Sequence, residues 1–211
     1  MKVFHFMEKQ YALSNLINKR LKVATLLSMN DTYEFYLNFH GADEADLENF
    51  KAHYNNSVGF LCFSTNLNDP VQWAHYADNH RGICFEFEIP DKILNEINYL
   101  DNPLHIDPNE PEWRDNLVKA TLCKYKGWSY EQEYRVTIDL SSEEVIVDGS
   151  GLKFVRIEKA FVPTKAYLGL RCELTKDEAE IFNSNGISAI QMLQDQKSYA
   201  VIQTVSSSVD G

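Results

Sequence analysis

Hydrophobic and polar positions along the chain change between the period of a strand and the period of a helix, without regular alternation. Strict alternation over Lys2–Phe6 predicts a first strand, and the apolar run Val58–Ser64 is typical of a buried central strand. Apolar residues at helical spacing predict a helix over Glu8–Leu21. Helices are also expected at Ala42–Tyr54, from Pro70 to Gly82, at Glu112–Lys124 and from Thr175 to Gly186, and strands at Gly82–Ile89, Gly127–Leu140, Ala160–Leu170, Ile187–Gln194 and Ser198–Val205, with a hairpin around Asp148–Gly151.

This order of elements indicates a fold class. It gives about eight strands with helices inserted irregularly, and no G-x-G-x-x-G follows a strand, so a doubly wound nucleotide-binding sheet is not expected. An α+β fold fits better, with mostly antiparallel, split β-sheets and inserted helices. We expect one domain over residues 1–205 and a frayed tail at residues 206–211.

The charge balance limits the partners. The 211 residues include 20 Lys and Arg against 31 Asp and Glu, a formal net charge of -11. Grip on a nucleic-acid backbone needs a surplus of cations, so no nucleic-acid partner is expected. An acidic chain of ordinary hydrophobic content fits a protein that meets small molecules or other proteins.

The cysteines and apolar segments indicate a compartment. The four cysteines include no C-x-x-C pair, and no run approaches the length of a membrane span. We therefore expect a cytoplasmic protein without a membrane partner, whose reduced cysteines serve as small buried hydrophobes. His75, His80 and Cys84 match no zinc-binding spacing, so no metal is expected.

The stretch Gly127–Leu140, GWSYEQEYRVTIDL, contains an unusual charge pattern. In a strand, Glu131, Glu133 and Arg135 would share one face, because successive side chains point to opposite faces. One interpretation is a solvated face, on which ion pairs contribute little. The other is a cleft that handles a cationic species, since a half-buried carboxylate needs a partner or a chemical task.

Two further segments carry aromatic candidates. Asp69 and Pro70 form a helix start, after which Trp73, Tyr76 and His80 would share a helical face. That face is either a stacking platform for a planar ligand or a core contact. His5, between two phenylalanines in the first strand, has the same two interpretations, a core histidine or a functional one.

Several motifs in order resemble the bacterial, uncharacterised family DUF2971. They are HF at His5–Phe6, SMNDTYE at Ser28–Glu34, LCFS at Leu61–Ser64, QWAHYADNHRGICFEF at Gln72–Phe87 and KGWSYEQEYRV at Lys126–Val136. The resemblance spans about Val3 to Leu170. It departs from the family pattern at Thr32, where the family would have Pro, and this puts the local turn in question.

A looser resemblance is to ADP-ribosyltransferases, which share three ordered strand motifs. His5, then Ser64 with Thr65, then Glu131 to Glu133 occur in that order. The resemblance implies an ADP-ribosyltransferase-like fold and NAD as substrate. Its implied catalytic residues are Glu133, facing a cationic ribose, Glu131, orienting the acceptor, and His5; its implied cofactor-binding residues are His5, Ser64, Trp73, His75, Tyr76 and Arg135.

These observations lead to one hypothesis and two alternatives. The hypothesis is an NAD-dependent transferase or NAD-cleaving enzyme, because a fixed carboxylate stabilises an oxocarbenium-like state. Its expected partner is a small-molecule nucleotide or a protein acceptor. The first alternative is a non-catalytic nucleotide- or protein-binding module. The second gives the charged triplet a structural role only.

Overall fold

The computed structural model describes residues 1–39 and 44–203, and the chain is divided into two compact units. Unit 1 consists of residues 1–20, 63–90 and 157 onward, and unit 2 consists of residues 21–62 and 91–156. The single domain expected over residues 1–205 stays a prediction. The expected tail at residues 206–211 lies outside the described residues.

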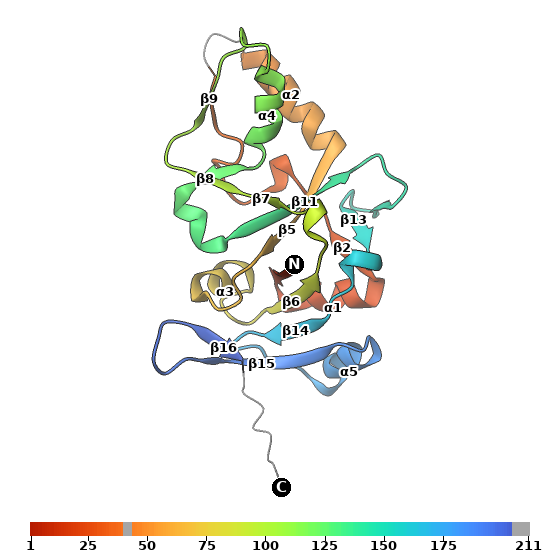
Figure 1. The fold of residues 1–211 in the computed structure, drawn as a ribbon. Helices are drawn as coiled ribbons and strands as arrows, with labels where there is room; N and C mark the ends of the chain where they lie inside the picture. The colour runs from red at the N-terminus through yellow and green to blue at the C-terminus, as the bar shows by residue number, and fades with distance from the viewer. Residues whose placement is uncertain (40–43, 204–211) are drawn as a thin grey trace. The chain divides into compact units, whose positions relative to one another are not determined.

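Unit 1 is built around a sheet with the strand order β16-β15-β14-β6-β1 (Figure 1). All pairs in this order are antiparallel except β14 with β15, and β1 also pairs with the end of β5 through Phe4 and Ser64. The elements of unit 1 are β1 (Lys2–Met7), α1 (Lys9–Asn18), α3 (Pro70–Tyr76), β6 (Ile83–Glu88), η4 (Lys159–Phe161), β14 (Lys165–Leu168), α5 (Lys176–Ser184), β15 (Ser188–Gln194) and β16 (Val201–Gln203).

The central strand of unit 1, β6, is buried on both faces. Its expected apolar face carries Ile83, Phe85 and Phe87, but Cys84 and Glu86 on the other face are buried as well. One side contributes to a core cluster. This cluster contains Phe4, Leu67, Trp73, Ala77, Cys84, Tyr167, Met192 and Val201.

Helix α3 begins as expected and ends early. The Asp69 side chain accepts hydrogen bonds from the backbone N–H groups of Val71 and Gln72, the usual N-cap arrangement. The prediction that the helix runs to Gly82 is wrong, because it ends at Tyr76. The three residues 78–80 all have positive φ angles, from 45° to 68°, which no right-handed helix allows, so His80 does not extend the helical face of Trp73.

Unit 2 contains several small sheets. Strand β5 pairs with β3 and neighbours β11, which pairs with β7; β10 pairs with β8 and β4 with β9, both in parallel; β12, β13 and β2 form a three-stranded sheet. The elements are β2 (Arg20–Lys22), β3 (Ala24–Thr25), η1 (Leu26–Ser28), β4 (Leu37–Phe39), α2 (Glu44–Ser57), β5 (Val58–Ser64), η2 (Asp91–Ile93), β7 (Asn95–Glu96), β8 (Asn98–Leu100), β9 (Leu104–Ile106), α4 (Trp113–Ala120), β10 (Cys123–Tyr125), η3 (Lys126–Glu131), β11 (Glu133–Asp139), β12 (Val145–Val147) and β13 (Lys153–Arg156). The first residue of β2 and the last two of β5 belong to unit 1.

An aromatic row contributes to the packing of unit 2. Phe35 stacks on Phe50, Phe50 on Tyr54 and Tyr54 on Phe60, with ring centroids 5.6 to 6.2 Å apart. Stacked rings add to the free energy gained from burying their area. Phe35 also belongs to the core cluster with Leu26, Ile106, Leu117 and Ala120, on which α2 and α4 pack.

Two sequence predictions in unit 2 placed element boundaries wrongly. The expected strand Gly127–Leu140 is a strand only from Glu133 to Asp139, because residues 126–131 form a 3-10 helix that ends at Gln132, with φ of 45°. The helix expected to reach Lys124 ends at Ala120. Thr121 follows the helix, and its hydroxyl donates a hydrogen bond to the Val118 carbonyl oxygen at 2.6 Å.

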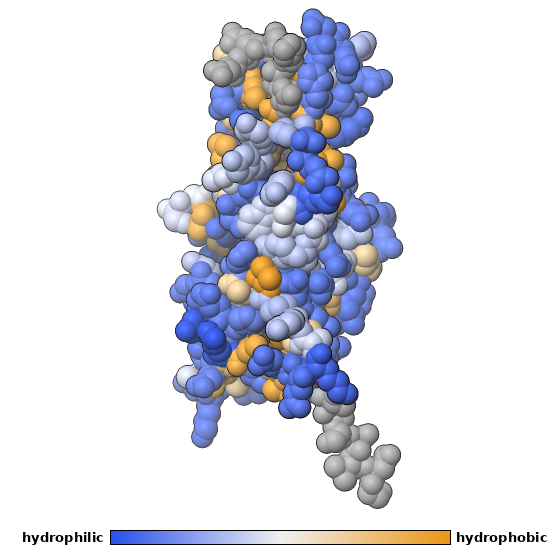
Figure 2. All heavy atoms as spheres, turned by 90° about the vertical axis from the view of Figure 1, so that its left-hand side faces the viewer, coloured by the Kyte–Doolittle hydropathy of each residue, from blue (hydrophilic) through white to orange (hydrophobic). Residues whose placement is uncertain are grey.

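The coarse fold class is confirmed, since strands and helices are mixed and the larger sheet is mostly antiparallel. No helix within the described ranges is long and apolar enough to cross a membrane. In the view of Figure 2, the surface is mainly hydrophilic and hydrophobic residues form small separate groups.

Candidate functional site

Unit 2 contains a cluster of five buried charged side chains, which we call the charge cluster. Its members are Glu34, Lys124, Glu131, Glu133 and Arg135, with side-chain exposures of 1 to 7%. Glu133 and Arg135 come from β11, Lys124 from β10, and Glu131 from the end of η3. The interpretation that Glu131, Glu133 and Arg135 form a solvated face is therefore wrong.

The members of the charge cluster are joined by short contacts. Lys124 Nζ donates to Glu131 Oε2 at 2.6 Å and to Glu133 Oε2 at 3.2 Å. Arg135 holds Glu133 with two nitrogens, Nε to Oε1 at 2.7 Å and Nη2 to Oε2 at 3.1 Å. Arg135 Nη1 also donates to Glu34 Oε1 at 2.6 Å and to the Thr121 carbonyl oxygen at 2.8 Å.

The electrostatics of the charge cluster keep Glu133 and Lys124 ionised. Burial raises the pKa of Glu133, but the charge and hydrogen bonds of Arg135 and the charge of Lys124 outweigh it and lower that pKa to about 2. Burial lowers the pKa of Lys124, and the carboxylates of Glu133 and Glu131 raise it well above its usual range. Lys124 is therefore an ammonium at neutral pH and not a nucleophilic amine.

Neighbouring groups complete the surroundings of the charge cluster. The Tyr99 hydroxyl accepts the backbone N–H of Glu133 at 2.8 Å, and burial raises its pKa to about 12. Burial, followed by the charge of Glu133, raises the pKa of the Cys62 thiol well above its usual range. Arg135 lies over the Phe60 ring, 5.5 Å from its centroid, and Lys124 lies 5.0 Å from the centroid of Trp128.

This arrangement answers the question raised by the E-x-E-x-R pattern. Two carboxylates do converge on one cation, but that cation is the protein's own Lys124. Glu133 is additionally paired with Arg135. In this conformation, every carboxylate of the triplet has a cationic partner, as buried charges require.

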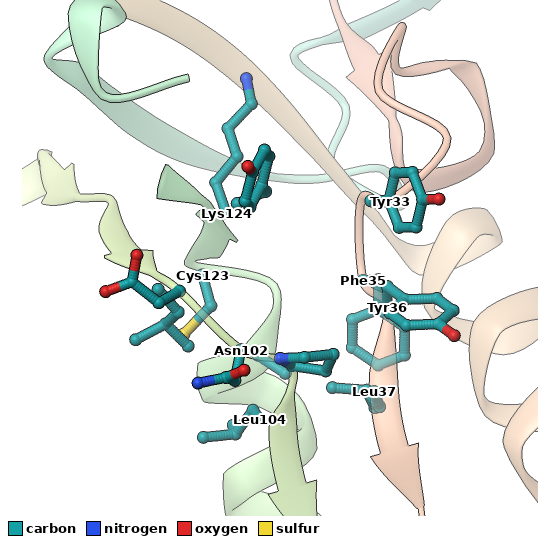
Figure 3. Close-up of a pocket in the computed structure, with 13 residues that line it drawn as sticks. Tyr33, Phe35, Tyr36, Leu37, Asn102, Leu104, Cys123 and Lys124 are labelled. Carbon is teal, nitrogen blue, oxygen red and sulfur yellow. The ribbon is translucent and has the colours of Figure 1, made fainter. Parts of the chain in front are cut away.

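A cavity of about 370 Å³ lies beside the charge cluster in unit 2. Figure 3 shows Tyr33, Phe35, Tyr36 and Leu37 on one side and Cys123, Asn102 and Leu104 on the other. Its volume falls in the range of small-molecule sites. The lining is completed by Leu100, Asp101, Pro103, Ala120, Lys124 and Tyr125.

The cavity combines aromatic walls with few charges. Tyr33, Tyr36 and Tyr125 are 56 to 60% exposed, and the rings of Tyr33 and Tyr36 meet edge to face with centroids 5.3 Å apart. Asp101 forms an ion pair with Lys126 on the exposed side. Lys124 is the sole cation among the lining residues, and its ammonium is occupied by two glutamates.

The other residues implied by the resemblance lie in unit 1. The His5 ring contacts Phe63 at 5.6 Å, and the buried Ser64 hydroxyl accepts the backbone N–H of Asn66. His75 is exposed at the end of α3, with its ring 6.2 Å from that of Tyr76. Their assignment as cofactor-binding residues stays a prediction.

Trp73 is a core residue of unit 1. Its ring is fully buried, its Nε1–H donates to the Leu67 carbonyl oxygen at 2.7 Å, and the rings of Trp73 and Phe6 meet in a T-shaped contact. This burial supports the core interpretation of the aromatic face on α3 over a stacking platform.

Sequence reasoning missed several buried charged residues, among them Glu34, Lys124 and Glu86. Glu34 and Lys124 complete the charge cluster, and Glu86 of unit 1 accepts from the Tyr167 hydroxyl at 2.7 Å and the Thr164 hydroxyl at 3.0 Å. Glu34 lies within the SMNDTYE motif, which was the one available signal. The sequence pattern did not indicate Lys124 as a partner of the glutamates, because this residue was predicted to lie in a helix.

Comparison with known proteins adds no relative. No family model, curated protein or solved structure matches the chain. The DUF2971 and ADP-ribosyltransferase resemblances therefore remain proposals. Within the described ranges, no group of three or more His, Cys, Asp or Glu side chains is placed to hold a metal ion.

Proposed function

We propose that this chain is a ligand-binding module and that the cavity of unit 2 takes a nucleoside-like molecule without phosphates. The observation that carries this proposal is the cavity of about 370 Å³, with three tyrosines in its lining. Aromatic side chains stack planar bases with a gain of about 1–3 kcal/mol per base. The Asn102 amide offers both a donor and an acceptor to the edge of a base.

The charges around the cavity favour an uncharged or cationic ligand over an anion. The charge cluster contains three carboxylates and two cations, which sum to a formal charge of -1. Asp101 adds a further carboxylate to the lining. A phosphate would meet no uncommitted cation among the lining residues, so a nucleotide should bind more weakly than its nucleoside.

A titration of adenosine and adenosine 5′-monophosphate against the full chain tests this proposal. Both share one base and differ in the phosphate. Isothermal titration calorimetry should show adenosine binding at least tenfold more tightly. Tyr36→Ala should weaken adenosine binding at least fivefold, while the control Tyr199→Ala, a fully exposed tyrosine of unit 1, should leave it unchanged.

Three results would contradict this proposal: no adenosine binding, equal binding of the monophosphate, or an unchanged affinity in Tyr36→Ala. A different result would indicate that the occupant is a protein segment. In that case adenosine would not bind, and a peptide rich in aromatic residues would protect Cys123 from labelling.

We propose NAD-dependent transfer or NAD cleavage as the second candidate function. Its support is the motif order and the convergence of Glu131 and Glu133 on one cation. The chemistry needs a carboxylate that faces a cationic ribose, so Glu133 would have to leave Arg135 and Lys124 when substrate binds.

The two candidates are separated by a nicotinamide-release assay with NAD. Release that Glu133→Gln abolishes would establish the second candidate. Absence of release over hours, together with adenosine binding that persists in Glu133→Gln, would favour the binding module.

A further inference from the structure

This inference rests on the proposed function and concerns what holds the walls of the cavity. One wall is formed by the segment Tyr33–Leu37 without Glu34, and the facing wall includes Ala120 and residues 123–125 of the segment 120–125 (Figure 3). Each wall carries one member of the charge cluster. Glu34 lies between Tyr33 and Phe35, and Lys124 lies at the centre of β10.

One nitrogen of Arg135 donates a hydrogen bond to each of the two segments that form the walls. Its Nη1 donates to Glu34 Oε1 at 2.6 Å and to the Thr121 carbonyl oxygen at 2.8 Å. Thr121 follows Ala120, which lines the cavity. The fully buried guanidinium of Arg135, on β11, thus connects the two walls of the cavity.

Glu133 and Lys124, also members of the charge cluster, add to this connection between the walls. Glu133 holds two nitrogens of Arg135 and also accepts from Lys124 Nζ. The wall that contains β10 is therefore connected to Arg135 twice, indirectly from Lys124 through Glu133 and directly through the Thr121 carbonyl oxygen. The wall at Tyr33–Leu37 is tied to it through the side chain of Glu34.

The wall that depends on Glu34 is also held in an uncommon backbone conformation. Phe35, the next residue, has a φ of 56° although it is a bulky, buried aromatic residue. Such a conformation costs free energy and persists only where the surroundings fix it. The Glu34 bond and the stacking of Phe35 on Phe50 are two contacts that fix it.

We propose that Glu34 is a positioning residue, which sets the tyrosine wall of the cavity for its ligand without touching that ligand. Its carboxylate is directed to Arg135, while the adjacent Tyr33 and Phe35 line the cavity. Loss of the Glu34 side chain frees the wall. The ligand must then order that wall when it binds, which weakens its affinity.

The binding arm compares two substitutions at this position. Glu34→Gln keeps an oxygen that accepts from Arg135, whereas Glu34→Ala removes it. With adenosine as probe, we expect Glu34→Ala to bind at least tenfold more weakly and Glu34→Gln to remain within threefold of the unchanged chain. Measurements are made well below the melting temperature, with folding checked by circular dichroism.

The matched control is Glu86→Gln in unit 1, because the side chains of Glu86 and Glu34 are 4% and 3% exposed. It should lower the melting temperature and leave adenosine affinity unchanged. If Glu34 acted on stability alone, its substitution would likewise lower the melting temperature and leave adenosine affinity unchanged. If Glu34→Ala does not fold, Glu34→Asp, which withdraws the carboxylate by one methylene, takes its place in both arms.

A second arm needs no ligand. Cys123 lines the cavity and is partly exposed, so its alkylation by iodoacetamide, followed by peptide mass spectrometry, reports the state of the walls. We expect at least fivefold faster alkylation in Glu34→Ala and less than twofold change in Glu34→Gln. An alkylation rate and an adenosine affinity that both stay unchanged in folded Glu34→Ala would overturn the inference. Absence of adenosine binding in the unchanged chain would overturn the proposed function instead, and the alkylation arm would still test Glu34.

Discussion

Arg135 Nη1 lies 2.6 Å from Glu34 Oε1, although 101 residues separate them in the chain. Both side chains are at least 97% buried, so each has exchanged water for the other. Because the attraction between two buried charges compensates their loss of hydration, removal of one partner leaves the other strongly destabilised.

Replacement of Arg135 by Met should therefore lower the free energy of unfolding by about 3–5 kcal/mol, because Glu34 and Glu133 would remain buried without it. Urea unfolding followed by circular dichroism measures the change. Lys126→Ala, which breaks the exposed ion pair with Asp101, is the control and should cost less than about 1 kcal/mol. Equal effects of the two substitutions would contradict the compensation argument.

The pH dependence of stability should carry a contribution from Glu133. Its folded pKa, about 2, lies below the ordinary value of 4.5, so its contribution is complete above pH 4.5 and is lost as the pH falls toward 2. The contribution is on the order of 3 kcal/mol. Urea midpoints at pH 7, 5, 4 and 3 should fall less steeply in Glu133→Gln. The exposed control Glu143→Gln should keep the original slope, and identical slopes for all three chains would refute the assignment.

The buried carboxylate of unit 1 gives a third expectation. Tyr167→Phe removes the hydroxyl that donates to Glu86 Oε2 at 2.7 Å and should cost about 1–3 kcal/mol. Thermal unfolding measures the loss. Because Tyr167 belongs to unit 1, adenosine binding should not change, and a weaker affinity would show that the ligand does not occupy the proposed cavity.

Trp73 should behave as a core residue. Its truncation in Trp73→Ala should lower the free energy of unfolding by about 3–5 kcal/mol, since a fully buried ring leaves a cavity. Denaturant unfolding provides the measurement. A nearly unchanged stability, together with lost binding of NAD, would restore the stacking role that the motif resemblance implies.

Local signals in the sequence predicted local structure well. Strand β5 has the expected limits, Val58–Ser64. Asp69 caps α3, and Thr175 caps α5 through a reciprocal bond with Glu178. These features depend on interactions within a few residues, which a sequence pattern contains.

Boundaries that depend on backbone strain were not predictable in this way. The left-handed residues 78–80 include no glycine, although Gly82 beside them is required, because a Cβ there would lie 2.2 Å from the Met7 carbonyl oxygen. Gln132, with φ of 45°, likewise separates Glu131 from the strand of Glu133 without any glycine signal. Tertiary contacts support these conformations, and a local pattern does not record them.

The candidate site was predictable in part. The E-x-E-x-R spacing predicted that Glu131, Glu133 and Arg135 lie close together, and they do belong to one charge cluster, although Glu131 precedes the strand. It could not supply Glu34, because that pairing crosses 101 residues, nor the cavity, because its walls come from separate segments. The solvated-face interpretation failed for the same reason, since burial depends on segments that the pattern does not contain.

The division of the chain has a consequence for its synthesis. Unit 2 draws on residues up to 156, whereas unit 1 needs β14, β15 and β16 from the later part of the chain. On a ribosome, unit 2 can close as soon as its last segment emerges. The strands β1 and β6 of unit 1 are synthesised long before β14. The edge of β6 that pairs with β14 therefore stays unpaired until β14 has been translated.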